Sequence, residues 1–191
     1  MNAESQASPA PPAADGGGTA PAYQYVLAFL VALIGGALGI MGAVVQEIRA
    51  GGLILLPFVG APIIEEALKP IGVYIALLRW PRALSSQLFT ALLAASAGVV
   101  FGVIESTIYV SLYVKDYPDW YLAFRFSVPI AVHATASYIV GLGIKRGVLD
   151  WMQGRGPLPK DSRNYFIGGV ALHAIYNVTA VSLVLAGPLD F

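Results

Sequence analysis

Five apolar segments, each long enough to cross a lipid bilayer as a helix, follow one another along this chain of 191 residues. A helix needs about 20 apolar residues to span the hydrocarbon core, and the chain shows neither strand-like alternation nor an internal repeat. The pattern predicts an all-α polytopic bundle of about five transmembrane helices, with residues 23–191 embedded in the membrane. The predicted spans are Tyr23–Val45, Leu53–Leu78, Leu88–Val114, Tyr121–Ile144 and Tyr165–Ala186.

The first 22 residues and the overall composition fit this picture. Residues 1–22 are rich in Ala, Pro and Gly, and we predict a disordered tail there. Charged residues make up 12% of the chain, about half the usual share in soluble domains. The net charge of zero gives no indication of a nucleic-acid partner, so the lipid bilayer is the expected environment. The lack of cysteine excludes disulfides, thiol nucleophiles and thiolate metal ligands.

Basic residues are concentrated in two of the connections between the predicted spans. The connections after the second and fourth spans contain Arg79, Arg82, Lys145, Arg146, Arg155, Lys160 and Arg163. Those on the other side contain only Arg49 and Lys115. We expect a multi-pass protein of the plasma membrane, and the positive-inside rule predicts that its N-terminus lies in the cytoplasm and its C-terminus outside.

Three charged residues interrupt the second apolar segment within one turn of helix. Glu65, Glu66 and Lys69 each cost about 2.5–3.5 kcal/mol at bilayer depth unless they have partners. Glu65 and Lys69 are four residues apart and can pair on one helix face, whereas Glu66 points about 100° away. Pro62 suits the first turn of a half-helix, whose positive dipole end would favour both carboxylates.

The third, fourth and fifth spans each add polar groups of their own. Glu105 lies in the third span, His133 with Ser137 in the fourth, and His173 with Asn177 in the fifth. Each of the two histidines shares a helix face with the polar residue four positions later. Ionisable groups in four of five spans are the pattern of a catalytic or ion-handling cavity inside a helical bundle.

Depth within the membrane is less consistent for two of these groups. Counted from the segment ends, Glu105 lies nearer the outer side and His173 nearer the inner side. At 1.5 Å per residue the difference is about 10 Å. Boundary shifts or helix tilt would have to bring the two side chains together.

The ordered set of polar motifs resembles the PrsW family of intramembrane proteases, which are relatives of the CAAX prenyl-protease and bacteriocin-processing membrane peptidases. The resemblance covers about 53–181. It is carried by Glu65-Glu66-x-x-Lys69, Phe101-x-x-x-Glu105, His133-x-x-x-Ser137 and His173-x-x-x-Asn177, and by the stretch from Arg125 through Pro129 to Gly141. The CAAX branch has Glu-Glu-x-x-x-Arg and a histidine in place of Glu105, so this chain resembles the PrsW family more than the CAAX branch.

The resemblance implies hydrolysis of peptide bonds inside or at the edge of the membrane. The candidate catalytic residues are Glu65, Glu66, Glu105, His133, His173 and Asn177, with Lys69, Arg125 and Ser137 in support. The implied partner is a single-span membrane-protein substrate, with an anti-sigma factor as one candidate.

Two versions of the chemistry follow from these residue types. In one, a glutamate acts as general base on a water molecule, and His173 and Asn177 support the oxyanion without a metal. In the other, His133, His173 and Glu66 hold Zn²⁺ and another glutamate is the base. The chain has no His-Glu-x-x-His motif, which favours the metal-free version.

Functions of other classes remain alternatives. A proton- or ion-coupled transporter or channel subunit would use the same buried groups as a relay, although the lack of a repeat disfavours the common transporter folds. A non-catalytic membrane scaffold would need none of them. A serine nucleophile at Ser137 is disfavoured because no Gly-x-Ser-x-Gly turn surrounds it.

Overall fold

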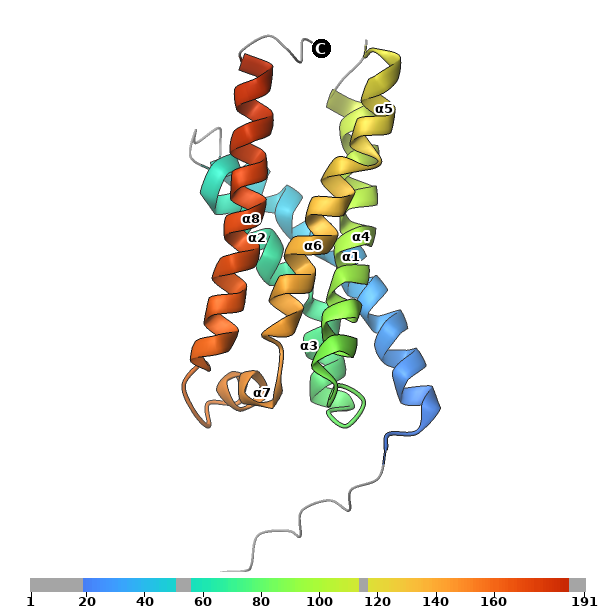
Figure 1. Ribbon diagram of the computed structural model, residues 1–191, viewed down its shortest axis with the longest axis vertical. Helices are drawn as coiled ribbons and strands as arrows, with labels where there is room; N and C mark the ends of the chain where they lie inside the picture. The colour runs from blue at the N-terminus through green and yellow to red at the C-terminus, as the bar shows by residue number, and fades with distance from the viewer. Residues whose placement is uncertain (1–18, 51–55, 114–116, 186–191) are drawn as a thin grey trace, which may run out of the picture.

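The computed structural model describes residues 19–50, 56–113 and 117–185, and over these residues every regular element is a helix (Figure 1). Residues 1–18 of the predicted disordered tail lie outside the described part. The elements are α1 (Ala22–Ala50), η1 (Leu56–Gly60), α2 (Ala61–Leu68), α3 (Ile71–Arg79), α4 (Gln87–Ile108), η2 (Tyr109–Tyr113), α5 (Asp119–Arg125), α6 (Val128–Leu142), α7 (Arg146–Met152) and α8 (Lys160–Leu185).

The prediction of an all-α membrane bundle is confirmed, whereas the count of five spans stays a prediction. Three helices, α1, α4 and α8, are long and apolar enough to cross a membrane. A fourth crossing is formed if Trp120–Leu142 and the following helix α7, bent by 83° from it, count as one broken span.

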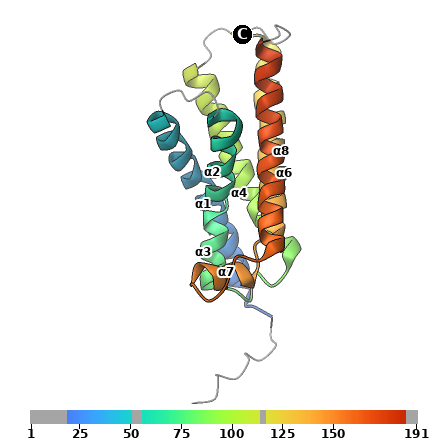
Figure 2. The same cartoon turned by 90° about the vertical axis from the view of Figure 1, so that its left-hand side faces the viewer.

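The predicted second span is divided into two short helices. Pro62 lies in the first turn of α2, as the sequence indicates, and α2 ends at Leu68. Pro70 follows the C-cap residue Lys69 and cannot continue the helix, because it has no N–H and its ring clashes with the preceding turn. Consequently α3 begins at Ile71, and α2 and α3 follow one another along the bundle in Figure 2.

The predicted fourth span is broken in the same way. Helix α5 ends at Arg125, and α6 begins at Val128 with Pro129 in its first turn. At the break, the Ser127 hydroxyl donates to the carbonyl oxygen of Ala123, near the end of α5, at 2.5 Å. Both interrupted spans therefore place a charged residue, Lys69 or Arg125, at a helix end.

Small residues allow α4 to approach its neighbours closely. A methyl group built on Gly98 would lie 2.5 Å from the carbonyl oxygen of His133, and one on Gly36 would lie 2.3 Å from the carbonyl oxygen of Ala97. These contacts press α4 against α6 on one side and against α1 on the other, as expected for small residues between membrane helices.

The last helix completes the bundle along α6 and α2. Gly169 of α8 lies against the backbone of Ala136 in α6. In Figure 1 the beginnings of α1, α4 and α8 and all of α7 lie at one end of the bundle, here called the α7 end, whereas α5 and the end of α8 lie at the other, the α5 end. The polar residues of the interrupted spans lie between these two ends.

Candidate active site

Eight of the polar side chains predicted from the sequence meet in one network between α2, α4, α5, α6 and α8. Each member contacts at least one other by a hydrogen bond or an ion pair. The members are Glu65, Glu66, Lys69, Glu105, Arg125, His133, Ser137 and His173. We call this set the polar network.

Lys69, which is fully buried, lies at the centre of the polar network. Its ammonium nitrogen is 2.5 Å from Glu66 Oε1, 3.4 Å from Glu65 Oε2 and 2.7 Å from His133 Nδ1. The same nitrogen lies 4.5 Å from the centre of the Phe101 ring, whose negative face attracts a cation. One cation thus holds both neighbouring carboxylates and one imidazole.

Glu66 is fully buried and has partners on both of its oxygens. Oε1 contacts Lys69 and accepts from His173 Nδ1 at 3.0 Å, and Oε2 accepts from the Ser137 hydroxyl at 3.2 Å. A carboxylate engaged in this way orients its neighbours rather than taking up a proton from a further group. Glu66 therefore fixes the positions of Lys69 and His173.

The contacts of His133 determine which of its ring nitrogens carries the hydrogen. An ammonium group can only donate, so the Nδ1 that faces Lys69 accepts. In the neutral ring Nε2 then carries the hydrogen and donates to Glu105 Oε2 at 2.9 Å. Both nitrogens of His133 are engaged in this state.

His173 and Glu65 are arranged differently, because they face one another with two acceptor atoms. His173 Nδ1 donates to Glu66, which leaves a lone pair on Nε2 of the neutral ring. That nitrogen lies 3.7 Å from Glu65 Oε2, a buried oxygen without a hydrogen-bond partner. Two buried acceptors at this separation repel one another, so a water molecule, a proton or a cation between them would be stabilising.

Glu105 and Arg125 extend the polar network toward the α5 end. Arg125 Nη2 lies 3.7 Å from Glu105 Oε2, and the guanidinium stacks on the ring of Tyr109 at 4.2 Å. The Ser106 hydroxyl donates to the carbonyl oxygen of Arg125 at 2.7 Å and so anchors the end of α5. Glu105, with one-fifth of its side chain exposed, is the most accessible carboxylate of the polar network.

The charges of the polar network do not cancel. Three carboxylates, those of Glu65, Glu66 and Glu105, are accompanied by the two fixed cations Lys69 and Arg125. With both imidazoles neutral, one negative charge is in excess at membrane depth, where an uncompensated charge is costly. A proton or a bound cation on this site removes the excess.

The structure brings together eight of the nine residues singled out from the sequence. The ninth, Asn177, lies one turn beyond His173 on α8 and is half-buried. Glu105 and His173 reach the same network through His133 and Glu66, and α8 begins at Lys160, five residues before Tyr165, which reduces the depth difference counted from the sequence. Tyr109 was not singled out, although it follows Glu105 by one helical turn and supports Arg125.

A metal ion would find three suitable ligand atoms here. Glu65, His133 and His173 each offer one, all within 4.8 Å of one another, and two histidines with one carboxylate are a known zinc donor set. Glu65 Oε2 has no hydrogen-bond partner, although Lys69 lies 3.4 Å from it, and Glu66 orients His173 as a metal ligand requires. His133 would first have to give up one of its two present contacts. The sequence hypothesis used Glu66 as the carboxylate ligand, whereas the geometry offers Glu65, because both oxygens of Glu66 are occupied.

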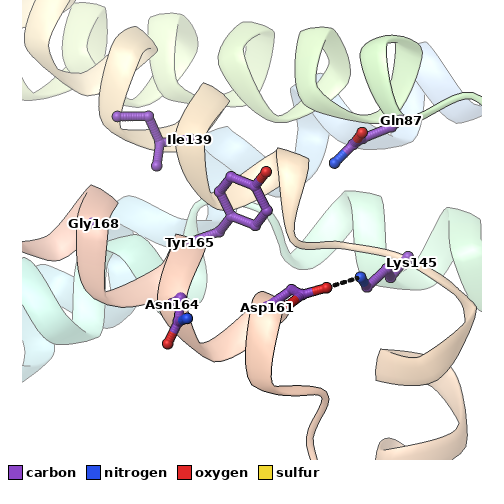
Figure 3. Close-up of a pocket in the computed structure, with 7 residues that line it drawn as sticks. All are labelled: Gln87, Ile139, Lys145, Asp161, Asn164, Tyr165 and Gly168. Carbon is purple, nitrogen blue, oxygen red and sulfur yellow. Dashed lines mark hydrogen bonds and ion pairs between the residues drawn. The ribbon is translucent and has the colours of Figure 1, made fainter.

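A separate groove lies at the α7 end and contains no residue of the polar network (Figure 3). Its volume is about 630 Å³, and it lies between the beginning of α4, the end of α6 and the beginning of α8. The ion pair between Lys145 and Asp161, 3.0 Å apart, closes one side of it.

Comparison with known proteins gives one match. The family model described as PrsW family intramembrane metalloprotease matches residues 20–189, which include the whole polar network. Searches of curated proteins and of solved structures gave no match.

Proposed function

The chain belongs to the PrsW family of intramembrane metalloproteases, and we propose that it hydrolyses peptide bonds of single-span membrane proteins at the polar network. An anti-sigma factor is one candidate substrate. The observation that carries the proposal is the pair of facing acceptors, Glu65 Oε2 and His173 Nε2, 3.7 Å apart and buried.

A water molecule fits the chemistry of this pair, since it can donate one hydrogen to each acceptor. Glu65 takes the proton as the water attacks the scissile carbonyl carbon, and it later gives the proton to the leaving amine. Because the polar network has one negative charge in excess, protonation of Glu65 relieves that charge. Glu65, rather than Glu66, is thus the general base of the proposal.

The remaining side chains hold this pair in place and stabilise charge. Glu66 orients His173, and Lys69 keeps the carboxylate of Glu65 close to that imidazole. Asn177, one turn beyond His173, is the proposed donor to the oxyanion that forms at the carbonyl. Glu105 and His133 complete the hydrogen-bond chain on the side of the α5 end.

A zinc-dependent version is favoured by the donor set itself. Glu65, His133 and His173 would hold the ion, which when bound would act as a Lewis acid and lower the pKa of water. Glu105, the most accessible carboxylate, would then be the base. The position of Lys69, beside both Glu65 Oε2 and His133 Nδ1, favours the metal-free version because an ammonium already lies against two of the three donors.

The proposal is tested with purified protein in detergent and a library of synthetic single-span peptides. In water enriched in ¹⁸O, hydrolysis introduces one labelled oxygen into the new carboxyl group, which mass spectrometry detects. We expect Glu65→Gln to reduce cleavage by at least about 10²-fold, the usual minimum for general-base catalysis. The matched control is Asp150→Asn at the α7 end, which should cleave like the wild type.

Two outcomes would overturn the proposal. Equal cleavage by the wild type and Glu65→Gln would exclude Glu65 as the general base. Solute or proton flux that depends on Glu65 in vesicles, without labelled product, would instead indicate a transporter.

We also propose that the α7 end faces the cytoplasm and that the membrane is the plasma membrane. Support comes from Lys145, Arg146, Arg155 and Lys160, which lie in or beside α7 and at the start of α8. Alkaline phosphatase fused after residue 191 should be active, because that enzyme folds only outside the cytoplasm. An active fusion at the N-terminus together with an inactive one at the C-terminus would reverse the orientation.

A further inference from the structure

The groove at the α7 end has an apolar wall and a polar end. The apolar wall is formed by Ile139 of α6 and by Tyr165 and Gly168 of α8. The polar end is formed by Gln87, Lys145 and Asp161, with Asn164 beside them (Figure 3). Such a gradient from apolar to charged over one groove matches an amphipathic ligand.

The groove lies where α6 ends, at the end of the bundle that we propose to face the cytoplasm. Ile139 precedes the end of α6 by one turn, whereas Lys145 follows that end by three residues outside the helix. The polar layer of a bilayer leaflet is about 5–8 Å thick. A lipid seated here would place its head group at the charged end and its first methylene groups along the apolar wall.

Lys145 and Asp161, the two charged residues at the polar end, can each form further hydrogen bonds with a ligand. Lys145 and Asp161 are paired at 3.0 Å, yet their side chains are 45% and 70% exposed. The Lys145 ammonium has three hydrogens, and the Asp161 carboxylate can accept about four hydrogen bonds, so one mutual contact leaves most of this capacity unused. The pair presents a cation and an anion side by side.

A second ion pair between a basic residue and an aspartate lies at the same end of the bundle and can be compared with Lys145–Asp161. Arg155 and Asp150 form a comparably exposed ion pair at the same end of the bundle. Neither residue lines the groove. The two pairs therefore provide an internal comparison of similar charge, because one pair lines this groove and the other does not.

We propose that the groove binds the head group of a phospholipid with a primary ammonium, of the phosphatidylethanolamine type. The phosphate lies at Lys145, the ammonium donates to Asp161, and an acyl chain follows Ile139 and Gly168. A choline head group has no N–H to donate to Asp161, and a glycerol head group has no cation to place there. The site is independent of peptide hydrolysis.

The experiment measures lipid retained by the full-length protein after extraction from vesicles of phosphatidylethanolamine, phosphatidylcholine and phosphatidylglycerol in equal amounts. Native mass spectrometry counts the bound lipids, and we expect phosphatidylethanolamine to be enriched at least about threefold over the other two. Lys145→Gln and Asp161→Asn should each remove the enrichment. Arg155→Gln and Asp150→Asn, which alter the comparison pair, should retain it.

One further variant tests the apolar wall without changing a charge. A Cβ atom on Gly168 would make an ordinary contact of 3.4 Å with Ile139, so Gly168→Leu fits the backbone while its larger side chain fills the groove. Loss of the enrichment is expected. Equal retention of the three lipids by the wild type would overturn the proposal, as would unchanged enrichment in Asp161→Asn. Preference for phosphatidylglycerol would also overturn it, since that result indicates a basic surface for anionic lipids.

Discussion

Replacing Lys69 by methionine should destabilise the bundle more than any exposed charge change. Lys69 is the fully buried cation between two carboxylates, at 2.5 Å from Glu66 and 3.4 Å from Glu65. At an effective dielectric constant of about 20, each contact contributes roughly 5–7 kcal/mol of Coulomb attraction. Desolvation of the three groups offsets much of this, and loss of one partner from a buried ion pair typically costs about 3–5 kcal/mol.

The loss of stability comes from the carboxylate charges that remain in the polar network without Lys69. With Lys69 gone, the three carboxylates of the polar network, two of them buried, face only the cation Arg125, and His133 Nδ1 loses its donor. At about 2–4 °C per kcal/mol for a chain of this size, the midpoint of thermal unfolding should fall by about 10 °C. The measurement is thermal unfolding of the purified protein in one detergent, monitored by circular dichroism.

Two further variants make the result specific to the polar network. Lys145→Met removes an exposed lysine from an exposed ion pair and should change the free energy of unfolding by less than about 1 kcal/mol. Adding Glu66→Gln to Lys69→Met should restore part of the stability, because it removes one of the stranded charges. The reasoning would be refuted by Lys69→Met unfolding at the wild-type temperature, or by a double variant less stable than the single one.

The remaining predictions concern packing, Ser137 and the metal. Gly98→Ala should lower stability by about 1–3 kcal/mol, because its methyl group would lie 2.5 Å from the His133 carbonyl oxygen; Gly156→Ala, which meets no atom within 4 Å, is the control in the same unfolding assay. Ser137→Ala should reduce cleavage by about tenfold through loss of the 3.2 Å bond to Glu66; abolished cleavage would instead point to a serine nucleophile. Exhaustive chelation, checked by elemental analysis, should leave cleavage unchanged; activity that is lost and then restored by zinc would make Glu65 a ligand.

The sequence alone predicts which side chains share a helix face, because residues four apart lie on one face. His133 with Ser137, and Glu65 with Lys69, both reach the polar network as that spacing implies. The expected pairing of Lys69 with Glu65 is the longer contact, at 3.4 Å, whereas Lys69 lies 2.5 Å from Glu66, three residues away. That contact depends on where α2 ends, and hence on Pro70 and on the helices packed around it.

Helix boundaries at the membrane surface were the least predictable feature. The count of apolar residues begins the last span at Tyr165, whereas α8 begins at Lys160 and includes the polar residues before Tyr165. Polar residues continue a helix without penalty where water reaches them, so hydropathy does not detect the added turn. The added residues place His173 near the middle of α8 and so reduce the depth difference from Glu105 that the sequence count gives.

The breaks in the two interrupted spans explain why cations can be held at this depth. Lys69 caps the end of α2, and Arg125 lies in the last turn of α5, where the helix dipole favours a positive charge. Interrupted backbone at membrane depth is tolerated only where protein or a cavity surrounds it. Pro70 and Pro129 end or begin helices at just these points, so the backbone features that would be costly in lipid supply the polar network with its two cations. A bundle of five uninterrupted helices could present the same side chains, but it would lack the helix ends that stabilise them.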